Sequence, residues 1–242
     1  MSSELFVFDS AQVAAEACGA TIFVLLDQAR SERGVARLAV SGGSTPKIMF
    51  EWMARQTFDW HGIDLFWVDE RCVPIYDSQS NYRMTRESLL DKIRLAPQQV
   101  HRVETEFPPE EAAARYVADL TRTFVLKPGE WPVFDVLQRG MGPDAHTASL
   151  FPGEPLINDR SHIAGLVWVE KFRQHRVTLL PGTLEHARST LCLVTGADKA
   201  DALEKVLRGP HDPLNVPSQI SSPQMTWYLD QKAATKVTLG AA

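Results

Sequence analysis

Short apolar runs alternate with amphipathic stretches along the whole chain. Glycine, proline and polar residues bound the runs, which is typical of buried strands. They predict strands at residues 5–8, 36–40, 63–68, 100–103, 133–137, 163–169, 177–180, 191–194 and 226–229. The stretches between them repeat apolar residues at helical spacing and predict helices near residues 10–30, 47–56, 84–93, 108–124 and 200–207. This alternation predicts a single α/β domain over residues 1–242, with a doubly wound, mostly parallel, Rossmann-like sheet and helices on both faces.

Composition narrows the class of partner and the compartment. The chain has 242 residues with 44% hydrophobic and 23% charged side chains, enough for a full core. A net charge of −5 disfavours a nucleic-acid partner. Cys18, Cys72 and Cys192 are far apart and odd in number, so they predict neither a disulfide framework nor a metal or redox pair. The chain begins without a signal-peptide pattern, and the apolar run at residues 22–26 is too short to span a bilayer. We therefore expect a cytoplasmic protein that contacts no membrane.

The first candidate binding segment is the turn Ser41-Gly-Gly-Ser-Thr-Pro46, between a predicted strand and a predicted helix. Unpaired amides at a helix start favour a phosphate or an oxyanion, and hydroxyl side chains add donors. A tight connection without a ligand is the alternative. The turn matches neither a dinucleotide fingerprint nor a P-loop, so no cofactor is predicted. The candidate residues are Gly42, Gly43, Ser44 and Thr45.

Charged residues follow the next strand. Arg71 has the planar fork that binds phosphate bidentately, and Asp69 is placed to orient it or a substrate hydroxyl. A solvated turn explains the same residues. Ser80-Asn-Tyr suits either polar contacts over a site or a helix cap. Lys199 stands in the first turn of a later helix, where a cation is unfavourable without a nearby anion.

The strongest candidate for chemistry is Gly140-Met-Gly-Pro-Asp-Ala-His146, directly after the strand at 133–137. Open α/β sheets bind ligands beyond the carboxyl ends of their strands. Histidine, with an unperturbed pKa of about 6.5, can take a proton from water at neutral pH, and Asp144 lies beside it in sequence. A surface pair is the alternative. No Gly-x-Ser-x-Gly elbow is present, and the seven histidines lack metal-ligand spacing, so no metal is predicted.

The segment from Gly140 to Gly153 resembles the signature of the 6-phosphogluconolactonases, within the group that also holds the glucosamine-6-phosphate deaminases. The turn at residues 41–46 and the Asp-Glu-Arg segment at 69–71 are similar too, and the resemblance extends over nearly the whole chain. It implies hydrolysis of a small sugar-phosphate lactone, 6-phosphoglucono-1,5-lactone, in the pentose phosphate route. His146 would be the base for water, oriented by Asp144 or Asp69. Amides of Gly42 and Gly43, or those around Gly142, would hold the oxyanion. The implied phosphate ligands are Arg71, Arg176 and Lys199.

The resemblance has one departure and leaves two alternatives. Ala145 stands where the family usually has glycine, and a positive φ there would cost about 1 kcal/mol and tilt His146. An aminosugar-phosphate deaminase/isomerase is disfavoured, because that family has tyrosine at the place of Arg71 and a different run after the histidine. A non-catalytic sugar-phosphate-binding regulator is weakened, because no DNA-binding segment is evident. The resemblance also suggests a small excursion around residues 155–175, and the sequence predicts no particular oligomeric state.

Overall fold

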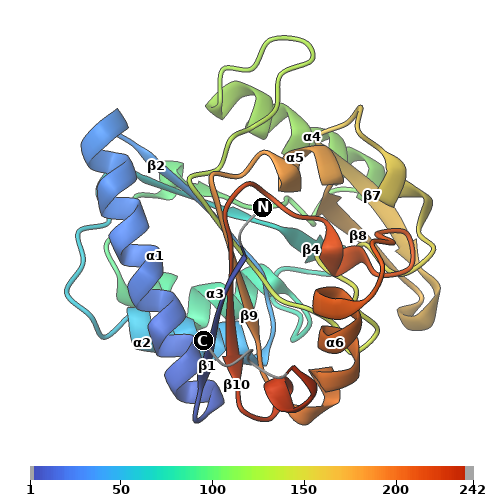
Figure 1. Cartoon of the computed structure of the whole chain (residues 1–242). Coiled ribbons are helices and arrows are strands. Elements are labelled where there is room, and N and C mark those ends of the chain that lie inside the picture. Colours follow the sequence, from blue (N-terminus) through green and yellow to red (C-terminus); the bar gives the residue numbers. More distant parts are fainter. Residues whose placement is uncertain (1–2, 238–242) are drawn as a thin grey trace.

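In the computed structural model, which describes residues 3–237, seven strands form one fully parallel sheet (Figure 1). Its order is β1-β10-β9-β6-β2-β3-β5. The strands are β1 Ser3–Phe8, β2 Ala36–Val40, β3 Ile63–Trp67, β5 Val100–His101, β6 Val136–Arg139, β9 Ser189–Val194 and β10 Met225–Asp230. Every pairing among them is parallel, so the predicted fold class is confirmed.

The strand order reverses between β2 and β6. From β2 the chain adds β3 and then β5 on one side; it then returns to β6 on the other side of β2 and adds β9 and β10. The loops that leave the carboxyl ends of β2 and β6 therefore diverge. A crevice at such a reversal is where open α/β sheets bind ligands.

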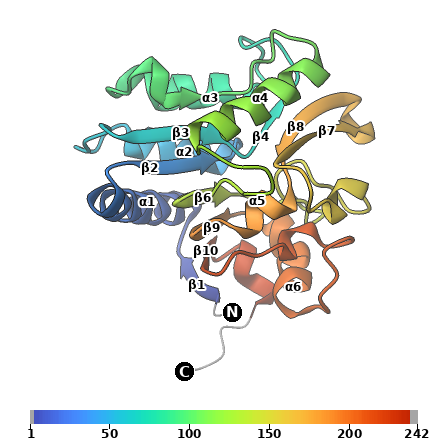
Figure 2. The same cartoon turned by 90° about the horizontal axis from the view of Figure 1, so that it is seen from above.

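Helices cover both faces of the sheet (Figure 2). Helices α1 (Ala11–Arg33), α2 (Ser44–Met53) and α3 (Asn81–Ser88) cover one face. Helices α4 (Pro109–Thr123), α5 (Pro181–Glu185) and α6 (Ala200–Arg208) lie on the other. Side chains alternate between the faces: on β3, Leu65 and Trp67 join the core under α1, whereas Phe66 joins the core under α4. Because both faces are covered, every residue of β6 and β9 is buried.

A second, antiparallel sheet flanks the parallel one. It has the order β4-β8-β7, with β4 Asp69–Arg71, β7 Ala164–Val169 and β8 Gln174–Leu179. The sequence predicts a loop at residues 69–71 and a shorter strand at 177–180. A three-residue polar segment carries no periodicity, and only its pairing with β8 makes it a strand. The excursion expected around residues 155–175 corresponds to β7 and the turn into β8.

Capping residues set the helix boundaries. Ser10 Oγ accepts a hydrogen bond from the Val13 N–H at 3.3 Å and starts α1, which ends at Gly34 with a φ of 77°. Helix α2 begins at Ser44 rather than at residue 47, with Pro46 inside its first turn. Helix α3 begins at Asn81 rather than at residue 84, because Ser80 caps it through the Arg83 N–H at 3.1 Å.

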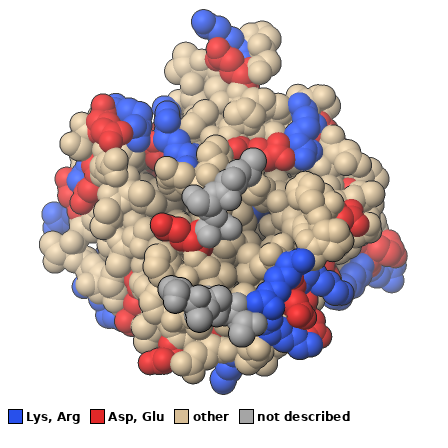
Figure 3. All heavy atoms as spheres, viewed as in Figure 1, with Lys and Arg blue, Asp and Glu red and all other residues tan. Residues whose placement is uncertain are grey.

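The surface and the cysteines bear on possible partners. Figure 3 shows basic and acidic side chains interspersed around the rim of one face. Within residues 3–237, no helix combines the length and apolarity needed to cross a bilayer. Cys18, Cys72 and Cys192 are free thiols. The absence of a nucleic-acid partner stays a prediction.

Candidate active site

A cavity opens at the carboxyl ends of β2, β6 and β9, where the strand order reverses. The sequence places its lining residues far apart, and the fold brings nearly all of the predicted site residues into this one lining. They are Gly42, Gly43, Ser44, Thr45, Asp69, Arg71, His146, Arg176 and Lys199. Asp144 is the exception, because it does not line the cavity and contacts His146 instead.

His146 and Asp144 form a hydrogen-bonded pair. His146 Nδ1 lies 2.5 Å from Asp144 Oδ1, and that oxygen is also 3.3 Å from the His146 backbone N–H. The hydrogen bond from His146 lowers the pKa of Asp144 to about 2, in spite of partial burial. An ionised carboxylate only accepts hydrogen bonds, so Nδ1 carries the hydrogen and Nε2 is the nitrogen that can accept a proton. The sequence also allowed Asp69 as the carboxylate that orients His146. In the structure, Asp69 Oδ2 instead accepts a hydrogen bond from Ser149 Oγ at 2.6 Å.

The loop that carries this pair needs glycine at position 142. A Cβ there would lie 1.9 Å from His146 Nδ1 and 2.6 Å from Asp144 Oδ1, so no side chain fits. The Gly142 N–H donates to His146 O at 2.9 Å and is already engaged within the loop. Ala145 stands where the family usually has glycine, and its φ is 65°. The positive φ considered for this position is therefore present. Alanine in this left-handed conformation is strained.

The turn after β2 forms another wall. A Cβ on Gly42 would lie 1.8 Å from Asn81 Oδ1, so the turn approaches α3 more closely than any side chain allows. Ser44 and Thr45 occupy the first positions of α2, where N–H groups have no acceptor within the helix. Thr45 Oγ1 lies 2.7 Å from Thr195 Oγ1 and joins this turn to the loop after β9. The wall therefore combines N–H groups that have no acceptor within the helix with the Thr45 hydroxyl, which Thr195 holds.

Arg71 and Arg176 stand opposite each other in the antiparallel register of β4 and β8. Among residues 3–237 neither forms an ion pair, and both Nε atoms are buried without a hydrogen-bond partner. Arg71 Nη1 donates to Gln79 O at 2.5 Å. Burial lowers the pKa of Arg176; the Asp69 carboxylate opposes this effect, and the Arg71 charge adds to it. Two adjacent, poorly compensated cations are costly unless an anion joins them.

Lys199 differs from the two arginines. Its Nζ lies 2.9 Å from Asp198 Oδ2. A cation near a helix start needs an anion close by, and for Lys199 the carboxylate of the preceding residue is that anion. Lys199 still lines the cavity.

Glu70 does not line the cavity, but it holds Arg71 and Asn81, which do. It is 1% exposed, and its carboxylate accepts hydrogen bonds from the backbone N–H groups of Arg71 at 2.7 Å, Asn81 at 2.8 Å and Tyr82 at 2.7 Å. Ser80 Oγ donates to it as well, at 3.2 Å. Burial raises the pKa of Glu70 to about 7, although these N–H donors pull the other way. The carboxylate thus ties β4 to the start of α3.

Sequence reasoning missed Glu70 and several cavity residues, among them Met141 and Thr195, and it named Asn81 only as part of the Ser80-Asn-Tyr segment. Asn81 is held by its Nδ2, which donates to Asp69 O at 2.9 Å. The Ser80-Asn-Tyr segment was the available signal, and the structure uses it both ways: Ser80 caps the helix and Asn81 lines the cavity. Glu70 was hidden because its neighbours in the strand face the cavity and it faces away.

Comparison with known proteins places the chain in a family. The family described as glucosamine-6-phosphate isomerases/6-phosphogluconolactonase matches residues 9–228, and the chain belongs to it. Within that family, the 6-phosphogluconolactonase of Synechocystis sp. is 35% identical over 96% of this chain and 98% of its own length.

Solved structures agree on the fold. The 6-phosphogluconolactonase from Thermotoga maritima superposes with a TM-score of 0.83 at 26% identity, covering 95% of this chain and 100% of its own. A monomeric glucosamine-6-phosphate deaminase reaches 0.81 at 15% identity, covering 96% and 99%. At that identity it shares the fold alone. The fold therefore does not distinguish a lactonase from a deaminase. That distinction has to rest on the residues in the cavity.

Proposed function

We propose that this protein hydrolyses 6-phospho-D-glucono-1,5-lactone to 6-phospho-D-gluconate, the lactone step of the oxidative pentose phosphate pathway. One observation carries the proposal: the His146–Asp144 pair meets, in one cavity, Arg71 and Arg176, which form no ion pair among the described residues. The first is equipped to activate water, and the second to hold a phosphate. A phosphorylated lactone needs both.

His146 acts as the general base in this proposal. Its Nε2 takes a proton from water while the water oxygen bonds to the lactone carbonyl carbon. The tetrahedral intermediate then breaks its bond to the ring oxygen, which receives the proton back from His146. Asp144 holds the required tautomer and stabilises the imidazolium that forms in between. Neither a covalent intermediate nor a cofactor is required.

The amides at the Gly42–Thr45 turn hold the oxyanion in this proposal. The sequence left two turns open for that role. The Gly142 N–H is already bonded to His146 O, whereas the start of α2 has N–H groups without helical acceptors. Asp69, which lines the cavity without contacting His146, accepts hydrogen bonds from sugar hydroxyls.

Arg71 and Arg176 bind the 6-phosphate, and Lys199 adds a third cation to the same cavity. A dianion between two guanidinium groups removes their mutual repulsion and gives their planar forks partners. We place the reaction in the cytoplasm, which the three free thiols support.

An aminosugar-phosphate deaminase is the second candidate, since the family includes such enzymes. One purified sample tests both: loss of 6-phosphogluconolactone is followed above its spontaneous hydrolysis, and ammonia release is followed with glucosamine 6-phosphate. We expect catalysed lactone loss and no ammonia. Ammonia release without lactone loss would reverse the assignment, and binding of sugar phosphate without either reaction would indicate a non-catalytic regulator.

A further inference from the structure

Two aromatic rings lie against Arg176, one of the two cavity arginines that form no ion pair among the described residues. Its Cζ is 4.9 Å from the ring centroid of Phe172 and 5.7 Å from that of Phe151. Both distances are within the range of cation–π attraction. Phe172 lies in the turn between β7 and β8, and its side chain is 48% exposed. Neither ring lines the cavity, so both act through the guanidinium.

Rings suit this position better than a carboxylate would. An acid beside Arg176 would fix the guanidinium but would also neutralise it and compete with an anionic ligand. An aromatic face attracts the cation through its quadrupole and leaves the N–H groups unpaired. The buried Nε of Arg176, which has no hydrogen-bond partner, fits such an arrangement.

Phe151 also touches the proposed base. Its ring stacks on His146 with centroids 4.2 Å apart and an interplanar angle of 28°. It also meets Phe172 edge-on, with centroids 6.2 Å apart. One ring thus contacts both the imidazole and the guanidinium.

We propose that Phe151 and Phe172 are positioning residues that hold Arg176 for the 6-phosphate and so set the preference for phosphorylated over plain lactone. This inference rests on the proposed function, because it takes Arg176 as a phosphate ligand. It adds a role for the exposed β7–β8 turn, which places one of the two rings.

The test compares three variants. Phe172→Leu keeps apolar bulk without a π face, and Phe172→Tyr keeps the ring. Trp168→Leu is the matched control: Trp168 is on β7 and 46% exposed, but it packs edge-on against His175 at 4.8 Å. The readout is the ratio of kcat/KM for 6-phosphogluconolactone to that for gluconolactone. We expect Phe172→Leu to lower the ratio about fivefold, mainly through KM, and Phe172→Tyr and Trp168→Leu to retain it.

Calorimetry of 6-phosphogluconate and gluconate binding separates this inference from the proposed function. If the wild type hydrolyses no lactone, the proposed function fails, while a weaker affinity of Phe172→Leu for 6-phosphogluconate alone would still support the aromatic positioning. Unchanged affinity and an unchanged ratio in Phe172→Leu would overturn it. An equal loss in Trp168→Leu, or in Phe172→Tyr, would overturn it as well.

Discussion

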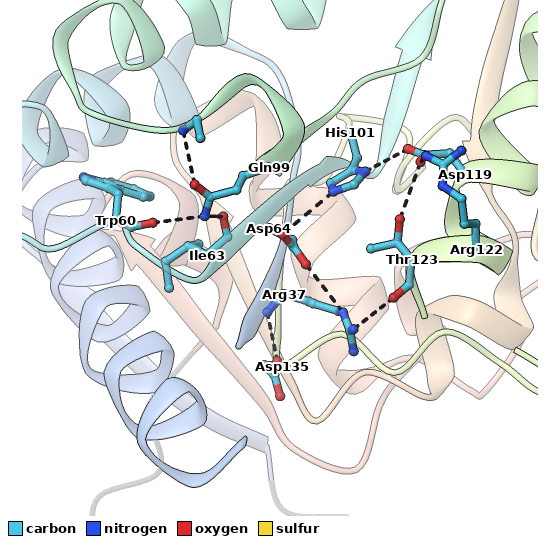
Figure 4. Close-up of polar contacts among 11 residues, drawn as sticks. Arg37, Trp60, Ile63, Asp64, Gln99, His101, Asp119, Arg122, Thr123 and Asp135 are labelled. Carbon is cyan, nitrogen blue, oxygen red and sulfur yellow. Dashed lines mark hydrogen bonds and ion pairs between the residues drawn. The ribbon is translucent and has the colours of Figure 1, made fainter. Parts of the chain in front are cut away.

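The two ends of the parallel sheet differ in whether their buried and half-buried charges are paired. At the amino ends of β2 and β3, Arg37, Asp64, His101 and Asp119 form a chain in which each charge meets an opposite one (Figure 4). At the carboxyl ends, Arg71 and Arg176 face each other without an ion pair among the described residues. The paired cluster joins elements of the fold, whereas we propose that the two arginines are paired by the phosphate of the substrate.

The amino-end cluster ties several segments together. Arg37 donates to Thr123 O at 3.0 Å, and its Nε lies 3.8 Å from Asp64. His101 Nδ1 lies 2.9 Å from Asp119 Oδ2, and its ring stacks on Phe66. Burial tends to lower the pKa of His101, but Asp119 and Asp64 outweigh this effect and raise it to about 9. The raised pKa favours the charged form of the His101 imidazole, which pairs with Asp64 and Asp119.

The largest expected effect is at the carboxyl end. We expect His146→Ala to lower lactone hydrolysis by at least about a hundredfold, because it removes the general base. Unfolding in denaturant should stay close to that of the wild type, since His146 is bonded mainly within its own loop. The assay subtracts spontaneous hydrolysis of the lactone. Near-normal activity in the folded variant would remove His146 from the mechanism.

Arg71→Lys tests whether the arginines at the carboxyl end bind the phosphate. Lysine keeps the charge and loses the bidentate fork, so the ratio of kcat/KM for the phosphorylated lactone to that for gluconolactone should fall about twentyfold. Part of the loss can appear in kcat, because remote binding helps to position the carbonyl. Arg37→Lys at the opposite end is the control and should leave the ratio unchanged. A ratio that stays constant in Arg71→Lys would shift phosphate binding to Arg176 and Lys199.

His101→Gln tests the amino end. We expect a loss of about 1 to 2 kcal/mol in the free energy of unfolding, with normal lactone hydrolysis. The raised pKa of His101 makes the loss depend on pH. The stabilisation is fully present below the unfolded-state pKa of about 6.5 and disappears as pH rises through about 9. Denaturant unfolding of both proteins across this range checks the sign; a gap that widens with pH would contradict it.

The smallest effect concerns the strained loop residue. Ala145→Gly should raise the free energy of unfolding by about 0.5 to 1 kcal/mol, because glycine adopts the observed φ of 65° without a Cβ penalty. Thermal unfolding monitors the gain. If the activity of the variant also rises, Ala145 tilts His146; if it does not, the strain is confined to the backbone.

The parallel sheet and the loops that carry the site could be predicted from the amino-acid sequence alone. Apolar runs separated by amphipathic helices report burial locally, and glycine turns report local backbone needs, so β2 and its turn were predicted from the pattern. The strand before the second loop was predicted too, but β6 lies at Val136–Arg139 rather than at residues 133–137. The motifs in those loops also pointed to His146, Arg71 and the chemistry proposed here. Helix boundaries shifted by a few residues where Ser80 and Gly43 cap them.

The way in which these segments contact one another could not be predicted from the sequence. Whether Asp144 or Asp69 contacts His146, and whether Arg71 stands opposite Arg176, depends on pairing between segments distant in sequence. In the sequence, Glu70 is one of several charged residues in a polar turn. In the structure it is buried against the start of α3 and holds that side of the cavity in place. Local pattern encodes which elements form, because periodicity is a property of neighbouring residues. Register and side-chain partnership come from contacts between strands, and those exist only once the chain has folded.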